Sequence, residues 1–150
     1  MSPNSTVFHK INALFSPLSQ QGSQKEFIAH ISESVHWEIP GHSPMSGTYT
    51  SRNHFVDRTL KVLAERVLTE PLRLRVMNVV GALNGDGDAM EGEVAVELQA
   101  IDAVCKNGLK YDMRYVWVCR FEGGKIVHVR AYSDTDLLTR AMKENMPELT

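Results

Sequence analysis

The stretch Arg114–Asp134, "RYVWVCRFEGGKIVHVRAYSD", decides the fold, because it has the pattern of two strands joined by a tight turn. Its centre, Gly123-Gly124, suits a two-residue hairpin turn in which both residues need a positive φ. Alternation along the second strand would place Val127, Val129, Ala131 and Ser133 on one face, and Ile126, His128, Arg130, Tyr132 and Asp134 on the other. The second, more polar set faces either water or a pocket, and the neighbouring strands decide between the two.

A second turn signal, Asn107-Gly108, predicts another hairpin just before this one. Counting outward from both turns, as two-residue turns, predicts which residues share one face of the sheet. The expected rows are Asp102, Met113 and Asp134; Ala100, Tyr115 and Tyr132; Leu98, Trp117 and Arg130; Val96, Cys119 and His128; and Val94, Phe121 and Ile126. This face collects the bulkiest apolar residues, so we expect it to line a pocket. A one-residue slip in either turn would exchange the two faces.

The opposite face of the predicted sheet is also rich in apolar side chains. It would hold Ala95, Ile101, Val116, Val118, Val127, Val129 and Ala131, with Glu97, Gln99, Arg114 and Arg120 among them. A monomer rarely leaves such a patch exposed. We therefore expect a homodimer that pairs these faces.

Helical patterns precede the sheet. Apolar residues at helical spacing predict a helix over residues 5–15, and a Ser-x-x-Glu capping box at Ser23 predicts a second helix that includes Phe27, Ile28 and Ile31. Residues 34–39 alternate as a strand, residues 41–51 are a predicted loop, and residues 53–68 are a predicted third helix. Strands are expected from Pro71 to about Ser133, followed by a short helix over residues 134–145. Helices followed by a mostly antiparallel sheet indicate an α+β fold, in one domain over residues 1–150.

Composition is typical of a soluble globular protein, with 43% hydrophobic and 23% charged residues in 150. The net charge of −2 gives no reason to expect nucleic acid or an anionic membrane as a partner. The chain has no apolar run of transmembrane length, and its beginning lacks the pattern of a signal peptide. Cys105 and Cys119 fall in strand-like segments, where buried free thiols of a reducing compartment are expected. We expect a cytoplasmic protein.

Three segments carry a resemblance to a known family. They are "WEIPGHSPMSGTY" at residues 37–49, "VAVE" at residues 94–97 and "GLKYDMRYVWVCRFEGGKIVHVRAYSDT" at residues 108–135. Together they resemble the SnoaL-like, ketosteroid isomerase-like branch of the nuclear transport factor 2-like superfamily, over roughly Val7 to Met142. The resemblance implies a cone-shaped, curved, mostly antiparallel sheet packed with three N-terminal helices and a short C-terminal helix. It also implies a pocket inside the cone, and such proteins are often dimers.

Function varies widely within this superfamily, which includes isomerases, cyclases, dehydratases, hydrolases and proteins without catalytic activity. Asp134 matches the acidic residue that the cyclases and epoxide hydrolases use near the end of the last strand. In an apolar pocket its pKa would rise, which suits a general acid or base. The alternative is that Asp134 caps the helix that follows it.

Further candidates share the predicted pocket face. Tyr115, Tyr132 and Tyr49 either donate hydrogen bonds to a substrate oxygen or are core residues. Arg130 either binds such an oxygen or forms an ion pair with Asp134 or Asp102. Asp102 either lines the pocket or is solvated near the hairpin end. Other expected pocket residues are Trp37, Met113, Trp117 and His128.

The pattern points to no metal site and no cofactor. The histidines lack ligand-like spacing, and the segment "NGDGDAMEGE" at residues 84–93 has Ala89 where a calcium loop needs Gly, so it is predicted to be a polar hairpin turn. The leading hypothesis is a cofactor-free isomerase, cyclase or dehydratase that acts by acid–base chemistry on a hydrophobic polycyclic or terpenoid-like molecule. The alternatives are a binding protein for a small apolar ligand and an interaction domain that works through its sheet face.

Overall fold

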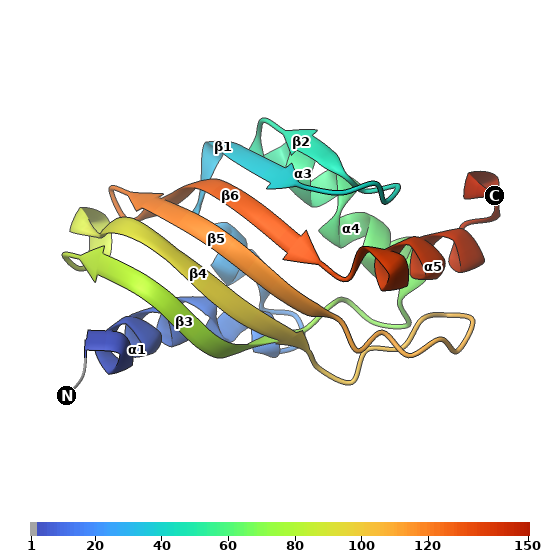
Figure 1. Ribbon diagram of the computed structural model, residues 1–150, viewed down its shortest axis with the longest axis horizontal. Coiled ribbons are helices and arrows are strands. Elements are labelled where there is room, and N and C mark those ends of the chain that lie inside the picture. The colour runs from blue at the N-terminus through green and yellow to red at the C-terminus, as the bar shows by residue number, and fades with distance from the viewer. Residues whose placement is uncertain (1–2) are drawn as a thin grey trace.

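The computed structural model describes residues 3–150, with side chains from Thr6 onward, so Met1 and Ser2 of the expected domain lie outside the described residues. Figure 1 shows its helices and strands. In chain order these are α1 (Pro3–Phe15), η1 (Ser16–Ser19), α2 (Gln24–Ile28), β1 (Ile31–Ile39), β2 (Gly47–Tyr49), α3 (Arg52–Arg58), α4 (Leu60–Val62), the π-helical turn η2 (Leu63–Val67), β3 (Leu74–Asn84), η3 (Gly87–Ala89), β4 (Glu91–Ala100), β5 (Arg114–Glu122), β6 (Lys125–Ser133), α5 (Thr135–Asn145) and η4 (Pro147–Leu149).

Six strands form one curved sheet in the order β2-β1-β6-β5-β4-β3, and only β1 and β6 pair in parallel. The helix α1 runs along β3 at one edge, while α3 packs against β1 and leads into α4 near the other edge (Figure 1). Buried residues from α1 to α5 join in a single core. The expected α+β fold, with a curved sheet, helices before it and a short helix after it, is therefore confirmed.

The helices before the sheet differ in detail from the sequence prediction. The Ser23 side chain does not cap α2, which is only five residues long, and Ile31 begins β1 instead of continuing a helix. The predicted third helix is interrupted at Thr59, whose φ of −125° and ψ of −79° leave the helical region. The reason for the first difference is packing: Ile31 is fully buried beside Ile126 of β6, and this sheet contact outweighs local helix preference.

The Gly123-Gly124 turn has the predicted form. Both glycines have positive φ, +57° and +77°, and Glu122 pairs with Lys125 across the turn. A Cβ at Gly124 would lie 2.4 Å from the carbonyl oxygen of Gly87, so this position requires glycine. The prediction that Phe121 pairs with Ile126 is confirmed as well.

Two residue pairs beyond this turn, a β-bulge changes the faces of β6. After the pair Phe121 and Ile126, the next pair joins Arg120 to His128, so that Val127 is the extra residue. The prediction that His128, Arg130 and Tyr132 share the inner face with Trp117 is therefore wrong. Val129 and Ala131 are buried on the inner face in their place. The bulge follows burial energetics, because an unpaired charged side chain inside the core costs more than one irregular pair.

The Asn107-Gly108 turn differs from the prediction without exchanging faces. It is a three-residue loop, in which Gly108 has a φ of +94° and donates its N–H to the carbonyl of Cys105. A second irregularity follows at Asp102, whose φ is +47°. Together the two irregularities shift the pairing of β4 with β5 by two residues from the predicted one. Leu98 therefore pairs with Tyr115, and Val96 pairs with Trp117. The faces predicted for β4 and β5 are thus correct, although the predicted partners are wrong.

An aromatic cluster fills most of the space between the inner sheet face and the helices. The Trp37 ring stacks on Phe55 at a centroid distance of 3.7 Å and meets Trp117 edge-on at 5.1 Å. The ring centroid of Phe27 lies 4.8 Å from that of Phe15 and 6.2 Å from that of Trp117.

Cys105 and Cys119 are buried and free, as expected, and burial raises the pKa of both thiols.

Candidate functional site

The interior cavity lies between the sheet and the helices, at the end of the sheet where β6 leads into α5. Its volume is about 40 Å³. It is bordered by Trp37, Ile39, Met45, Phe55, Thr59, Leu60, Leu63, Leu72, Tyr115, Trp117, Ala131, Ser133 and Leu138. None of these residues carries a charge, so the cavity favours uncharged groups over ions.

The polar side-chain groups at the cavity come from five residues, namely Trp37, Thr59, Tyr115, Trp117 and Ser133. The Thr59 hydroxyl donates to the carbonyl of Phe55 at 2.7 Å and is satisfied within its own helix. The Tyr115 hydroxyl shares a hydrogen bond of 2.7 Å with the Tyr111 hydroxyl. Two others, Trp37 Nε1 and Ser133 Oγ, are buried and have no hydrogen-bond partner in the structure.

The two tyrosines form a hydrogen-bonded pair that stays neutral, in which Tyr111 is fully buried and Tyr115 is partly buried. Burial raises the pKa of Tyr115, and burial together with the Tyr115 neighbour raises the pKa of Tyr111 well above the ordinary value. Neither hydroxyl therefore acts as a base near neutral pH, but either can donate or accept a hydrogen bond. Tyr111 was missed in the sequence, although its spacing of four residues from Tyr115 places both on one face of an extended chain.

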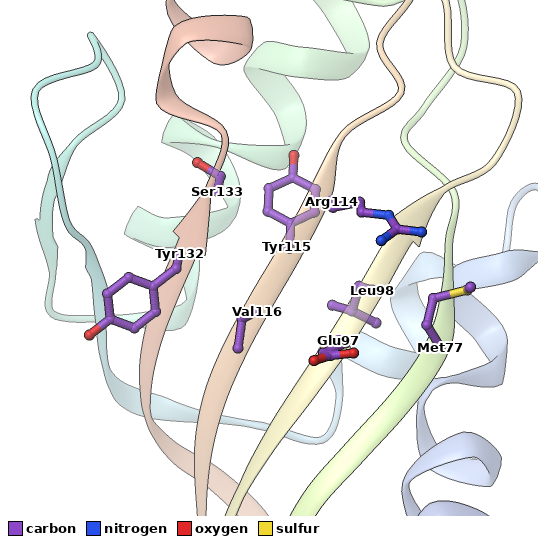
Figure 2. Close-up of a pocket in the computed structure, with 8 residues that line it drawn as sticks. All are labelled: Met77, Glu97, Leu98, Arg114, Tyr115, Val116, Tyr132 and Ser133. Carbon is purple, nitrogen blue, oxygen red and sulfur yellow. The ribbon is translucent and has the colours of Figure 1, made fainter.

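The outer groove is a second, larger hollow, and it lies on the opposite face of the sheet. Its volume is about 350 Å³, and Figure 2 shows the residues around it: Met77, Glu97, Leu98, Arg114, Tyr115, Val116, Tyr132 and Ser133. The Arg114 guanidinium donates to the side-chain oxygen of Gln99 at 2.9 Å. Tyr115 and Ser133 border both hollows, so this cross-strand pair separates the outer groove from the interior cavity.

Asp134 does not border the interior cavity. It is exposed, and its Oδ1 accepts the backbone N–H of Leu137 at 3.1 Å as the N-cap of α5. Of the two alternatives stated for this residue, the structure therefore shows the capping contact. A carboxylate at this position also suits the N-terminal end of a helix electrostatically.

The other three residues predicted as catalytic divide between the two faces. Tyr115 borders the interior cavity, whereas Tyr132 and Arg130 lie on the outer face because of the bulge in β6. Arg130 forms an ion pair with Glu93 at 2.9 Å. The expected partners Asp134 and Asp102 are not involved in that pair.

The predicted pocket residues also separate. Trp37 and Trp117 border the interior cavity, whereas Met113 is fully buried in the core beside it. The Tyr49 hydroxyl donates to the carbonyl of Met45 at 2.6 Å, as a satisfied core tyrosine does. Asp102 is exposed at its bend, and His128 stacks on His36 on the outer face, with ring centroids 4.8 Å apart.

Ala131 and Ser133 are cavity residues of β6 that the sequence prediction assigned to the wrong face. The signal was present, because Val127, Val129, Ala131 and Ser133 are the small and mostly apolar set of β6.

Across residues 3–150, no group of three or more His, Cys, Asp or Glu side chains could hold a metal ion. Nor does any helix in that range have the length and apolar character needed to cross a membrane.

Solved structures of other proteins are similar to this chain. An NTF2-like protein from Burkholderia thailandensis E264 matches with 23% identity over 95% of this chain and 98% of its own, with a TM-score of 0.56. A candidate polyketide cyclase from Pseudomonas putida KT2440 matches with 20% identity over 87% and 93%, at a TM-score of 0.54. A candidate SnoaL-like polyketide cyclase from Jannaschia sp. CCS1 matches with 12% identity over 94% of each chain, also at 0.54.

The sequence matches no family model and no curated protein, so the likeness rests on three-dimensional structure. At these identities it shows the fold and leaves the activity open. The three superpositions cover 87–95% of this chain, so the likeness extends over nearly all of the sheet and its helices. The protein therefore has the nuclear transport factor 2-like fold, which it shares with SnoaL-like proteins.

Proposed function

We propose that the protein binds a small, uncharged, mostly apolar molecule in the interior cavity. The observation that carries this proposal is the lining of the cavity, which contains both tryptophans of the chain and no charged residue. Ligand pockets are typically apolar and aromatic, with few polar groups that fix orientation. The cavity has that composition.

The size of the cavity requires a movement of its wall. About 40 Å³ is far below the roughly 300–1,000 Å³ of ordinary ligand pockets. The wall formed by α3, α4 and η2 is the irregular one, because it is interrupted at Thr59 and ends in a π-helical turn. Such turns interrupt regular helix packing and often occur at functional sites. We expect Leu60 and Leu63 to move outward when a ligand enters.

Binding is better supported than acid–base catalysis by Asp134. A general acid or base must lie within hydrogen-bond reach of the reacting atom, and Asp134 instead caps α5 outside the cavity. The isomerase, cyclase or dehydratase hypothesis thereby loses its proposed acid–base residue, while the binding hypothesis needs only the cavity. The candidate cyclases among the similar structures share the fold, and their names describe those proteins.

Intrinsic tryptophan fluorescence tests the binding proposal, because Trp37 and Trp117 both border the cavity. Titration with benzene and methylenecyclopentane should give a saturable change in emission. Ala131→Leu should fill the cavity and remove that change, whereas Ala95→Leu, on the opposite face of the sheet, should preserve it. If no saturable change appears with the wild-type protein, the proposal is wrong.

A second proposal concerns the outer face of the sheet, which we propose as the contact surface of a homodimer. Met77, Val80 and Tyr132 are 43%, 58% and 45% exposed there, beside the half-buried Val116 and Val118. The surrounding charges have both signs (Glu93, Glu97, Arg114 and Arg120), so a rotated second copy can oppose unlike charges. Sedimentation equilibrium should show a dimer that Val118→Asp dissociates. A wild-type protein that stays monomeric at every concentration would contradict this proposal.

A further inference from the structure

Two buried polar groups without partners lie in residues that border the same cavity. Among the described residues, the buried side-chain nitrogen and oxygen atoms that lack a hydrogen bond are Trp37 Nε1 and Ser133 Oγ. Trp37 is 1% exposed, and both residues line the interior cavity from the neighbouring strands β1 and β6. Figure 2 shows Ser133 beside Tyr115 at the end of the two strands.

Such groups are unusual, because roughly nine in ten buried polar groups in proteins are hydrogen-bonded. Leaving one unsatisfied costs about 1–3 kcal/mol. Two of them in residues that line one apolar cavity mark a place where a polar group of a ligand can bind. The tyrosine pair does not serve this purpose, since Tyr111 and Tyr115 already bond each other.

The chemistry of the two groups restricts the occupant. The indole N–H of tryptophan only donates, so its partner must be an acceptor, and a serine hydroxyl donates or accepts. A carboxylate or phosphate is excluded as an occupant because no cationic side chain borders the cavity, and Arg130 is paired with Glu93 on the other face of the sheet. An ammonium group only donates hydrogen bonds, so it would leave the indole N–H without a partner.

Resting on the binding function proposed above, we propose that the ligand of the interior cavity is a neutral carbonyl compound. The indole N–H of Trp37 donates a hydrogen bond to the carbonyl oxygen, and the Ser133 hydroxyl makes a second polar contact with the ligand. The apolar body of the ligand lies against Leu60, Leu63 and Trp117. Trp37 is held for this purpose by stacking on Phe55 and by edge contact with Trp117.

The test compares two probes of similar shape, cyclopentanone and methylenecyclopentane, which differ in a single acceptor oxygen. Two-dimensional ¹H–¹⁵N NMR of the labelled protein gives a Kd for each and resolves the indole N–H signals of Trp37 and Trp117. We expect cyclopentanone to bind about 2- to 10-fold more tightly than the hydrocarbon, as one net hydrogen bond contributes. Its binding should also shift the Trp37 indole proton downfield.

Three variants locate the effect. Trp37→Phe keeps an aromatic ring but removes the donor, so the preference for cyclopentanone should vanish, and Ser133→Ala should reduce it. Trp117→Phe removes the other indole that borders the cavity, whose Nε1 is not among the unpartnered atoms, and should preserve the preference. If Trp37→Phe does not fold, Ser133→Ala and the indole shift still decide.

The outcomes separate this inference from the function on which it rests. If both probes bind the wild-type protein equally well, the binding function stands and the carbonyl inference is wrong. If neither probe binds, the binding function itself is wrong. If Trp117→Phe removes the preference and Trp37→Phe does not, the inference is also overturned.

Discussion

The inner and outer faces of the sheet are built from the same strands, yet they differ in almost every physical property. On the inner face Val96, Trp117 and Val129 are at most 3% exposed and lie in the aromatic core. On the outer face Glu97 is exposed and Arg130 is partly so. Because side chains alternate along a strand, a single extra residue determines which of the two environments each side chain enters.

The two faces also differ in whether their polar side chains have partners. Charges on the outer face pair with each other, as Arg130 does with Glu93 at 2.9 Å and Arg120 with Glu122 at 3.2 Å. The interior cavity has no charge, and two of its polar groups have no partner at all. Exposed pairs contribute little to stability, whereas unsatisfied buried groups are costly. This difference is the basis for proposing small-molecule binding in the interior cavity and association between two copies through the outer face.

The largest effect is expected from Val129→Asp, because Val129 is fully buried on the inner face, where the bulge at Val127 puts it. The substitution would place an unpaired carboxylate in the core, so we expect loss of the folded state, a cost above about 5 kcal/mol. Circular dichroism and NMR dispersion would measure this. Deletion of Val127 is the contrasting variant, because a ladder without the extra residue keeps Arg120 opposite His128 and leaves Val129 and Ala131 on the inner face, so this variant should still fold. A Val129→Asp variant with a normal melting temperature would show that Val129 does not face the core.

Consecutive residues of β4 give a sharper comparison of the two faces. Leu98 is 1% exposed on the inner face, and Glu97 is exposed on the outer face. Leu98→Ala should lower the free energy of unfolding by about 2–5 kcal/mol, because it leaves a cavity in the core. Glu97→Ala should change it by less than about 0.5 kcal/mol. Urea denaturation of both variants measures the difference, and similar losses would contradict the assignment of faces.

A smaller effect is expected where β6 leaves the sheet and Asp134 caps α5. Asp134→Ala should destabilise the protein by about 1 kcal/mol, because the N–H of Leu137 loses its acceptor. Asp134→Asn keeps an acceptor oxygen and should retain most of the stability. Thermal unfolding distinguishes the two variants. Equal stability of Asp134→Ala and the wild type would mean that the cap does not stabilise the helix.

The smallest effect concerns protonation on the outer face. Partial burial, and then the neighbours His36 and Arg130, lower the pKa of His128 below 6.5. Just below pH 6.5, the folded state therefore binds fewer protons at His128 than the unfolded state does. The contribution of His128 to the free energy of unfolding is complete above pH 6.5, and it declines as the pH falls toward the pKa of the folded state. NMR titration should show that His36→Gln raises the pKa of His128, whereas His54→Gln, near Tyr49, leaves it unchanged. An unchanged pKa in His36→Gln would exclude the coupling.

Much of the fold was predictable because its signals are local or repeated along the chain. The Gly123-Gly124 turn, the faces of β4 and β5 and the helix after β6 all follow from short patterns, and the resemblance to SnoaL-like proteins supplied the overall architecture. The candidate site was less predictable. Trp37, Trp117 and Tyr115 were found, whereas Ser133 was assigned to the outer face, and Arg130, Tyr132 and His128 to the inner one.

The sequence by itself determined the elements that depend on neighbouring residues, namely the type of the Gly-Gly turn and the alternation within each strand. Only the tertiary structure decided where that alternation shifts, because a β-bulge costs little locally and is selected by the burial of Val129 and Ala131 against β1 and the helices. The same distant packing leaves Trp37 and Ser133 without partners at one cavity, which no local pattern in the chain specifies.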